Sequence, residues 1–156
     1  MKVSKVMNQK IIAVNRSTTL AELIELFRHF HSFPLVPVVD EHNTLIGVVS
    51  FQRLIEAFRA SGQDILKTVA FVDEHHLNIF DMDITSEVGE LCIVDDIMQT
   101  KFVTIRQDSS IKEAYRLMQV HQNEQLPVVD SENKLVGMIG AFDILLAIFR
   151  DKGVIK

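Results

Sequence analysis

The stretch LPVVDSENKLVGMIGAFD, residues 126–143, decides the fold. It holds two short apolar runs separated by Asp130-Ser-Glu-Asn133, a tetrapeptide typical of a tight turn. An apolar segment with helical spacing follows directly, and Asp143 lies in its first turn. The pattern therefore predicts a β-hairpin that leads straight into a helix.

The same frame occurs earlier in the chain as VPVVDEHNTLIGVVSFQR, residues 36–53. At the entrance to the predicted helix this copy has Ser50 where the later copy has Gly140. It also has Arg53 where the later copy has Asp143. The positions that a hairpin needs are shared: Pro37 with Pro127, Asp40 with Asp130, Asn43 with Asn133 and Gly47 with Gly137.

The repeat extends upstream of both hairpins. VSKVMNQKIIAV, residues 3–14, and VDDIMQTKFVTI, residues 94–105, share Val, Met and Lys in register and end in runs typical of strands. Both are followed by a capping box, Thr19 with Glu22 and Ser110 with Glu113. Apolar residues then recur at helical spacing: Leu20, Leu23, Ile24, Phe27 and Phe30 in one copy, Ile111, Ala114, Tyr115 and Met118 in the other.

Each copy therefore predicts the order β-α-β-β-α, ending in a helix over 51–60 or 141–150. A copy of about 60 residues buries little core alone, so the two copies should pack on each other. We expect an α/β (α+β) fold with a first repeat at 1–60, a linker at 61–92 and a second repeat at 93–156.

The linker matches neither copy. DILKTVAF, residues 64–71, predicts one helix, and apolar residues continue beyond it. Two interpretations stay open: a tether packed along the edge of the protein, or an element specific to a dimer or another partner. The apolar residues that could dock are Leu77, Ile79, Phe80, Met82 and Ile84.

Composition excludes several functions. Of the 156 residues 47% are hydrophobic and 24% charged, as in ordinary globular domains. The formal net charge is −5 and no basic cluster occurs, which argues against nucleic acid as a partner. The N-terminal MKVSKVMNQK lacks the apolar core of a signal peptide, and no apolar run approaches the ~20 residues that span a bilayer. We expect no membrane partner and a cytoplasmic location.

Catalytic and metal chemistry find little support. No nucleophile elbow, P-loop or zinc-protease motif occurs, so an enzyme is not expected. His75 and His76 could suggest a metal, but adjacent side chains do not converge on one point, so a solvated segment is the alternative that we favour. Cys92 lies between Leu91 and Ile93, which indicates a packed thiol in a buried strand rather than a reactive one.

The ordered set of motifs, present twice, resembles the CBS domain. The resemblance covers nearly the whole chain outside residues 61–92 and is to tandem CBS proteins of the stand-alone bacterial type. It implies a Bateman module: two repeats packed about a pseudo-two-fold axis, with a cleft for an adenosyl ligand at each helix entrance. It also implies a homodimer, for which candidate apolar positions on the final helices are Phe51, Phe58, Phe142 and Phe149.

The family motif is a glycine, a hydroxyl residue (Ser or Thr) and an Asp or Asn across the last strand and the helix entrance. The second copy keeps Gly137 and Asp143 but has Gly140 in the hydroxyl position. A carboxylate accepts hydrogen bonds from both ribose hydroxyls, although Asp143 is also a plain favourable charge at a helix start. By the resemblance, the second cleft would also use Lys101, Phe102, Val103, Leu126 and Pro127.

The first copy departs further from the motif. Ser50 supplies the hydroxyl, or only an N-cap, and Arg53 has donors only and cannot accept from a ribose. Ile12 and Pro37 would complete this first cleft, unless they are plain core residues. Because of Arg53, the second cleft is the better candidate for binding.

The resemblance implies a non-catalytic regulatory module that senses an adenosyl ligand and signals to an unknown effector protein in trans. No cofactor is required; the possible regulatory ligands are AMP, ADP, ATP and S-adenosylmethionine. Glu124 precedes the second strand where relatives often carry a phosphate-binding His or Arg, which disfavours a triphosphate. The alternative is a ligandless dimeric scaffold, which Arg53 and Gly140 favour and Asp143 beside Gly137 disfavours.

Overall fold

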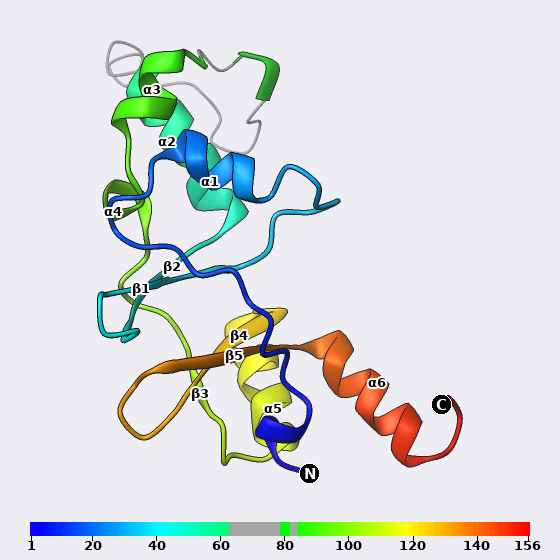
Figure 1. Cartoon of the computed structure of the whole chain (residues 1–156). Helices are drawn as coiled ribbons and strands as arrows, with labels where there is room; N and C mark the ends of the chain where they lie inside the picture. Colours follow the sequence, from blue (N-terminus) through cyan, green and yellow to red (C-terminus); the bar gives the residue numbers. More distant parts are fainter. Residues whose placement is uncertain (63–78, 82–83) are drawn as a thin grey trace.

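The computed structural model describes residues 1–62, 79–81 and 84–156, and Figure 1 shows them as two halves stacked end to end. The first half contains α1 (Leu20–Leu26), β1 (Val36–Val39), β2 (Leu45–Val49) and α2 (Phe51–Gly62). In the sequence, the short helices η2 (Ile79–Asp81), α3 (Ser86–Leu91) and α4 (Val94–Ile97) come between the two halves. The second half contains β3 (Ile105–Arg106), α5 (Ile111–His121), β4 (Gln125–Val129), β5 (Leu135–Gly140) and α6 (Ala141–Asp151), and a 3-10 turn, η1 (Val3–Lys5), begins the chain.

The predicted β-α-β-β-α order is confirmed in the second repeat. Its sheet has the order β3-β4-β5, with β3 parallel to β4 and β4 antiparallel to β5. In the first repeat the leading strand is reduced to one residue, because Val14 forms a single parallel bridge to Val38 beside the β1-β2 hairpin. Each copy contains its predicted hairpin and its predicted final helix.

Local capping explains where the first helix of each repeat begins. The Thr19 hydroxyl accepts from the Glu22 amide at 3.2 Å, and the Glu22 carboxylate accepts from the Thr19 amide at 2.8 Å. The Ser110 hydroxyl accepts from the Glu113 amide at 3.1 Å. Helix α1 is shorter than its apolar spacing predicted: it ends at Leu26, and Phe30 lies beyond it. The aromatic rings of this region pack on one another instead of extending the helix.

The hydrophobic core is divided between the repeats. One buried cluster joins α1, the β1-β2 hairpin and α2 of the first repeat with Val94 and Ile97 of α4. A second lies within the second repeat and includes Val3 from the N-terminus of the chain. A third, smaller cluster lies between the repeats and contains Leu45, Val129 and Leu135. The core of the first repeat thus includes residues that precede the second repeat in the sequence. The core of the second repeat likewise includes a residue that precedes the first repeat.

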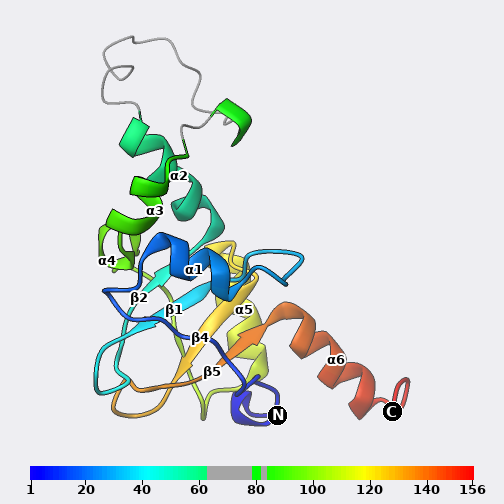
Figure 2. The same cartoon turned by 45° about the horizontal axis from the view of Figure 1, so that its top comes forward.

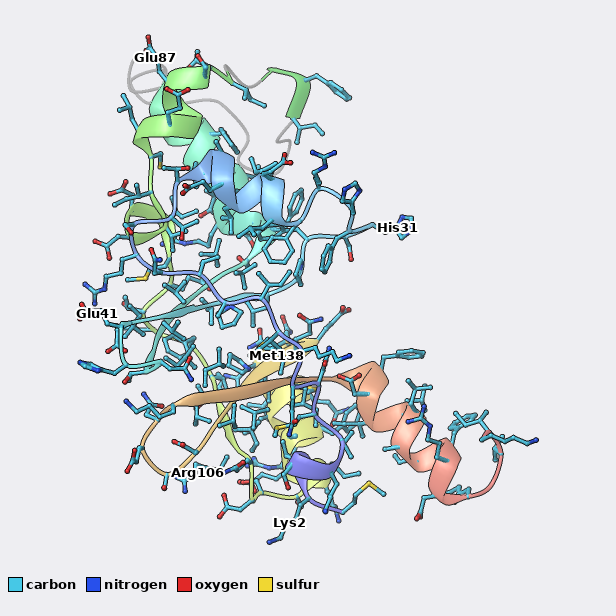
Figure 3. All side chains as sticks on the ribbon, viewed as in Figure 1. Lys2, His31, Glu41, Glu87, Arg106 and Met138 are labelled. Carbon is cyan, nitrogen blue, oxygen red and sulfur yellow. The ribbon has the colours of Figure 1, made fainter. Side chains whose placement is uncertain are left out.

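The leading segments of the two repeats are exchanged. Asn8, which precedes the first repeat's strand, pairs with Met138 of β5 through N–H···O bonds of 2.8 and 3.0 Å. Gln99, which precedes the second repeat's strand, pairs with Val48 of β2 in the same way. Figure 3 shows Lys2 at the second-repeat end of the molecule, far from Glu87, and Met138 near the junction.

The two hairpin turns meet between the repeats in a reciprocal pattern. The amide of Leu45 donates to the Asn133 carbonyl at 3.1 Å, and the amide of Leu135 donates to the Asn43 carbonyl at 3.0 Å. Both Asn residues have φ of 61°, the left-handed conformation that Asn tolerates. Each bond has a counterpart with the repeats interchanged, as a pseudo-two-fold axis requires.

The region between the repeats differs from the prediction. Helix α3, which the sequence did not predict, packs on α1, with Gly89 against Ala21. Cys92 follows α3 in a half-buried loop, so its assignment to a buried strand was wrong, although it does pack on the first core. Exposed Ile79 and Ile84 leave both interpretations of the linker open. The helix predicted at 64–71, His75, His76, Leu77 and Met82 lie outside the described residues.

Candidate functional site

Asp143, the acidic residue of the predicted ligand site, lies at the entrance to α6. Strand β5 ends at Gly140, which is the N-cap of α6. Asp143 lies in the first turn, and its Oδ2 accepts a hydrogen bond of 2.7 Å from the Gly140 amide. The side chain is half-buried, and its Oδ1 accepts no hydrogen bond from the described residues. One carboxylate oxygen therefore fixes the side chain, while the other is available to a ligand.

The start of β4 connects this entrance to the first repeat. The Glu124 carbonyl accepts from the amide of Ala141 at 2.9 Å, which holds the beginning of α6 against β4. The next residue, Gln125, accepts through Oε1 from the amide of Leu35 at 3.1 Å. Gln125 therefore crosses between the repeats beside Gly140, a role that the sequence analysis missed.

Two hollows meet at Asp143. A groove of ≈ 960 Å³ lies between α5 and α6 and reaches Gly140 and Asp143 at its end. A smaller hollow of ≈ 560 Å³ lies between α6 and the N-terminal segment. Its lining combines apolar and charged side chains: Met1, Lys5, Val6, Asp143, Leu146, Ala147, Arg150 and Asp151.

The entrance to α2 is built differently. The Ser50 hydroxyl accepts from the Arg53 amide at 3.3 Å, so Ser50 is an N-cap, as its alternative interpretation proposed. The Arg53 guanidinium donates from Nε to the Ile97 carbonyl at 3.2 Å, and its Nη1 lies 3.3 Å from a Glu56 carboxylate oxygen. Arg53 therefore ties α2 to α4, and the position offers no acceptor to a ribose.

The exchange of leading segments decides which residues lie beside which entrance. Met138, two residues before Gly140, pairs with Asn8, so the chain from Asn8 to Ile12 leaves from the α6 side. Lys101 to Val103 follow the segment that pairs with β2, and so leave from the α2 side. Phe102 packs in the cluster between the repeats, and Val103 packs on the second core.

The remaining predicted site residues are mostly packed in the interior. Leu126, Pro127 and Pro37 have fully buried side chains, whereas Ile12 is 38% exposed. Gly137 faces the exchanged N-terminal segment: a Cβ there would lie 2.8 Å from Met7 Sδ. The signal for this contact was in the sequence, because Met and Gly recur at matching positions in both repeats. It could be interpreted only once the partner of each was known.

The part of the chain that the structure describes contains no group of three or more His, Cys, Asp or Glu that could hold a metal ion. No helix among those residues is long and apolar enough to cross a bilayer.

Of the four Phe predicted to serve a dimer, Phe58 is buried in the first core. Phe51, Phe142 and Phe149 are exposed on α2 and α6.

Comparison with known proteins agrees with this architecture. The profile of the CBS domain matches residues 3–60 and 94–150. The CBS domain-containing protein CBSX2 of Arabidopsis thaliana is 28% identical over 148 residues. The match covers 92% of this chain and 61% of CBSX2, so the chain spans less than two thirds of that relative.

Solved structures of related proteins show the same fold. The structure of CBSX2 in complex with AMP superposes with a TM-score of 0.71 at 24% identity, over 97% of this chain and 98% of the chain in that structure. The cytosolic domain of the Mg²⁺ channel MgtE, in complex with ATP, is 28% identical with a TM-score of 0.62, over 90% of this chain and 46% of that one. Since the profile covers both repeats and most of the chain, the protein belongs to the CBS-domain family and carries a tandem pair of these domains.

Proposed function

We propose that this protein is a non-catalytic regulatory module that binds an adenosyl ligand such as AMP at the entrance to α6. The observation that supports the proposal is Asp143, which is held by the Gly140 amide and keeps Oδ1 available. A ribose presents two hydroxyl donors, and a half-buried carboxylate accepts them through charge-assisted hydrogen bonds. CBSX2, solved in complex with AMP, and the cytosolic domain of MgtE, solved in complex with ATP, share this fold and support the same ligand class.

The surroundings of Asp143 suit the rest of such a ligand. The extended chain from Asn8 to Ile12 offers backbone groups for an adenine edge and the partly exposed Ile12 for its face. Lys5 and Arg150 line the hollow beside Asp143 and can balance a single phosphate. Asp143, Asp151 and the exposed Glu124 nearby make the site unfavourable for a triphosphate, so AMP or S-adenosylmethionine fits better than ATP.

One ligand per chain is expected. At the α2 entrance, Arg53 has no acceptor to offer, and its guanidinium already contacts Ile97 and Glu56. The Arg53 side chain therefore occupies the first cleft at the position where the second cleft has the Asp143 carboxylate. We expect binding with a stoichiometry of one per chain.

Binding would be converted to a signal by a population shift. The proposed ligand contacts α6 of the second repeat and the exchanged segment that leads into the first. The ligand therefore stabilises the arrangement of the repeats to which it binds more tightly. The free energy of this stabilisation cannot exceed the difference between its binding free energies for the two arrangements. A homodimer in the cytoplasm, formed through the exposed apolar faces of the helices, would present that arrangement to an effector protein.

Calorimetric titration with AMP, ADP, ATP and S-adenosylmethionine tests the proposal. Asp143→Ala removes two charge-assisted hydrogen bonds, so we expect Kd to rise roughly tenfold to a hundredfold for each bond of about 1.5–3 kcal/mol. Asp108→Ala is the matched control, because this carboxylate is exposed and lies 3.6 Å from the Arg106 guanidinium on the surface of the second repeat. Arg53→Ala should change ligand affinity little.

Two results would overturn the proposal. Equal affinity of wild type and Asp143→Ala would show that this carboxylate does not hold the ligand. A folded dimer that binds none of the four compounds up to millimolar concentration would support the ligandless scaffold instead.

A further inference from the structure

The negative charge of the chain is concentrated in the stretch that precedes the second repeat. Residues 79–96 contain six of the 21 Asp and Glu residues and none of the 16 Lys and Arg residues. The same stretch carries strongly exposed apolar side chains: Phe80 is 88% exposed, Leu91 79% and Ile84 62%. Apolar side chains that lie exposed among charges of one sign are typical of a surface that binds a partner.

Helix α3 has two unlike sides. Val88 and Cys92 are four residues apart, and both pack on the first core. The exposed side carries two carboxylates and two apolar side chains, which we call the α3 face: Ile84, Glu87, Glu90 and Leu91. Glu87 and Leu91 are also four residues apart and so lie side by side, and Ile84 comes three residues before Glu87. Figure 3 shows Glu87 at the end of the molecule, pointing away from the ribbon.

The local structure leaves the α3 face open. An apolar residue just before an N-cap ordinarily packs on the residue at the fourth helical position. Here Thr85 is the N-cap, and the fourth position is Gly89, which has no side chain to cover Ile84. No cation among the residues that the structure describes lies within ion-pair distance of Glu87 or Glu90. The α3 face therefore has both apolar area and negative charge to offer a partner.

We propose that the α3 face binds a basic amphipathic segment of the effector protein, one that presents apolar side chains flanked by Lys or Arg. Ile84 and Leu91 would pack against the apolar side chains of that segment, and the two Glu carboxylates would pair with its cations. Ile84 and Leu91 are seven residues apart, about 10 Å along a helix axis, so apolar residues at i and i+7 of a partner helix match their spacing. The inference rests on the effector protein proposed above and gives it a surface and a chemistry.

The charge of the α3 face selects among the possible occupants. A second copy paired through the same face about a two-fold axis would bring like charges together, which costs binding free energy. An anionic lipid surface and nucleic acid are repelled by the same carboxylates. A basic segment is attracted, and the attraction also speeds its association at low salt. The excess of acidic residues thus favours a cationic partner.

Backbone hydrogen bonds connect α3 with the segment proposed to contact the ligand, residues 8–12. Figures 1 and 2 both show α3 beside α1 and away from α6, so the ligand site and the α3 face are separate. The Arg16 carbonyl, which follows that segment, accepts from the amide of Asp95 at 3.0 Å. The Thr18 carbonyl accepts from the amide of Val94 at 2.8 Å. A ligand that shifts residues 8–12 would therefore shift the end of α3, which links the binding of ligand and effector.

Fluorescence anisotropy with model peptides tests the proposed chemistry. The probe is a labelled peptide of about 18 residues made of Leu and Lys, with Leu at i, i+3, i+4 and i+7 of a helix. The same peptide with Glu in place of Lys is the charge control. We expect wild type to bind the Leu/Lys peptide and not the Leu/Glu peptide. Binding of both peptides alike, or of neither, would overturn the proposal.

An apolar substitution locates the peptide on the surface. Leu91→Ser should raise the Kd of the Leu/Lys peptide about tenfold, as expected for an apolar anchor. Val120→Ser is the matched control, because Val120 is 63% exposed on α5, outside the α3 face, and should leave the Kd unchanged. Both side chains are exposed, so neither change should affect folding, which circular dichroism checks. Equal Kd values for the two variants would refute the assigned surface.

Neutral substitutions test the carboxylates. The double variant Glu87→Gln/Glu90→Gln should raise the peptide Kd about threefold to tenfold at low salt, and by a smaller factor at high salt, where charges are screened. Glu41→Gln/Glu132→Gln removes the same charge from exposed positions in the two hairpin turns and should change the Kd little. An equal rise in both double variants would mean that the peptide responds to net charge alone, and would overturn the proposal.

A titration of the peptide with and without saturating AMP tests the link to the ligand site. Because coupling is reciprocal, AMP should change the peptide Kd by the same factor as the peptide changes the AMP Kd. A peptide Kd that is unchanged by bound AMP would overturn the link. If calorimetry detects no binding of AMP, the proposed ligand function fails, whereas the peptide titrations still decide whether the α3 face is a docking surface.

Discussion

Gly137→Ala should destabilise the protein, because Gly137 is where the exchanged N-terminal segment crosses β5. A Cβ at this position would lie 2.8 Å from Met7 Sδ and 3.0 Å from the Asn8 carbonyl oxygen. The thioether can rotate away, since it ends a flexible side chain. The carbonyl oxygen belongs to the backbone, and Asn8 is fixed by its two hydrogen bonds to Met138. The clash between the new Cβ and the Asn8 carbonyl can therefore be removed only if the N-terminal segment moves away from β5.

Two opposing effects determine the size of the change. Alanine in place of glycine restricts the unfolded chain and ordinarily stabilises by about 0.4–1 kcal/mol. Overpacking of a well-packed contact costs about 1–3 kcal/mol, and each strained backbone hydrogen bond costs up to about 1 kcal/mol more. The clash should therefore outweigh the gain, and the free energy of unfolding should fall by about 1–3 kcal/mol.

Urea denaturation followed by circular dichroism measures the change directly. With a slope of about 1–3 kcal/mol per molar urea, the midpoint should fall by about 1 M. Gly47→Ala should behave alike, because its Cβ would lie 2.8 Å from Met98 Sδ and 3.1 Å from the Gln99 carbonyl oxygen. Gly89→Ala is the control: its Cβ would meet Ala21 at an ordinary 3.5 Å, and alanine favours a helix. If Gly137→Ala is as stable as wild type, the exchange of segments is refuted.

Two further predictions concern the hairpin turns. The amides of Thr44 and His42 donate to the Asp40 carboxylate and lower its pKa below the ordinary value of an aspartate. The resulting stabilisation is present above the pKa of the unfolded chain and is lost as the pH falls through the lowered pKa of the folded protein. Asp40→Asn should therefore flatten the acid limb of a plot of urea midpoint against pH. Asn133→Ala should lower the free energy of unfolding by about 1–2 kcal/mol in the same assay, because Asn133 has φ of 61° and its Nδ2 donates to the Leu45 carbonyl. Asn133→Gly should cost less, because glycine adopts this φ without strain. Equal losses for the two variants would contradict the left-handed turn.

Local patterns allowed much of the fold to be predicted. The turn residues, the capping boxes and the apolar spacing act over a few neighbouring positions, so hairpins and helices were found without knowledge of the partner repeat. The end of α1 could not be predicted in this way. Phe27 and Phe30 continue the helical spacing, and it is the packing of their rings with Phe33 that brings them together outside the helix.

The exchange of segments could not be predicted because it joins positions far apart in the chain. Asn8 and Met138 carry no mutual signal, and a local interpretation assigns each leading segment to its own repeat. The family resemblance placed Lys101 to Val103 at the second cleft, whereas in the structure the chain after Asn8 leaves from the α6 side. Asp143 and its place at the helix entrance followed from the repeat alone, but the contact of Gln125 with Leu35 depended on tertiary structure.

The difference between the two helix entrances gives the proposed regulation a physical basis. At the α2 entrance, the Arg53 guanidinium reaches from the first repeat to the Ile97 carbonyl of α4, the segment that leads into the second repeat. The matching segment at the α6 entrance carries Val6, and Asp143 cannot donate to a carbonyl there because a carboxylate is an acceptor. The α6 entrance therefore lacks this direct link between a side chain and the exchanged segment. A ligand that donates its ribose hydroxyls to Asp143 and also contacts the exchanged segment would supply the link. A ligand at 100 times its Kd would add about 2.7 kcal/mol to the stability of that arrangement. The first cleft would then be a permanent link between the repeats, and the second a link that forms only when the ligand is present.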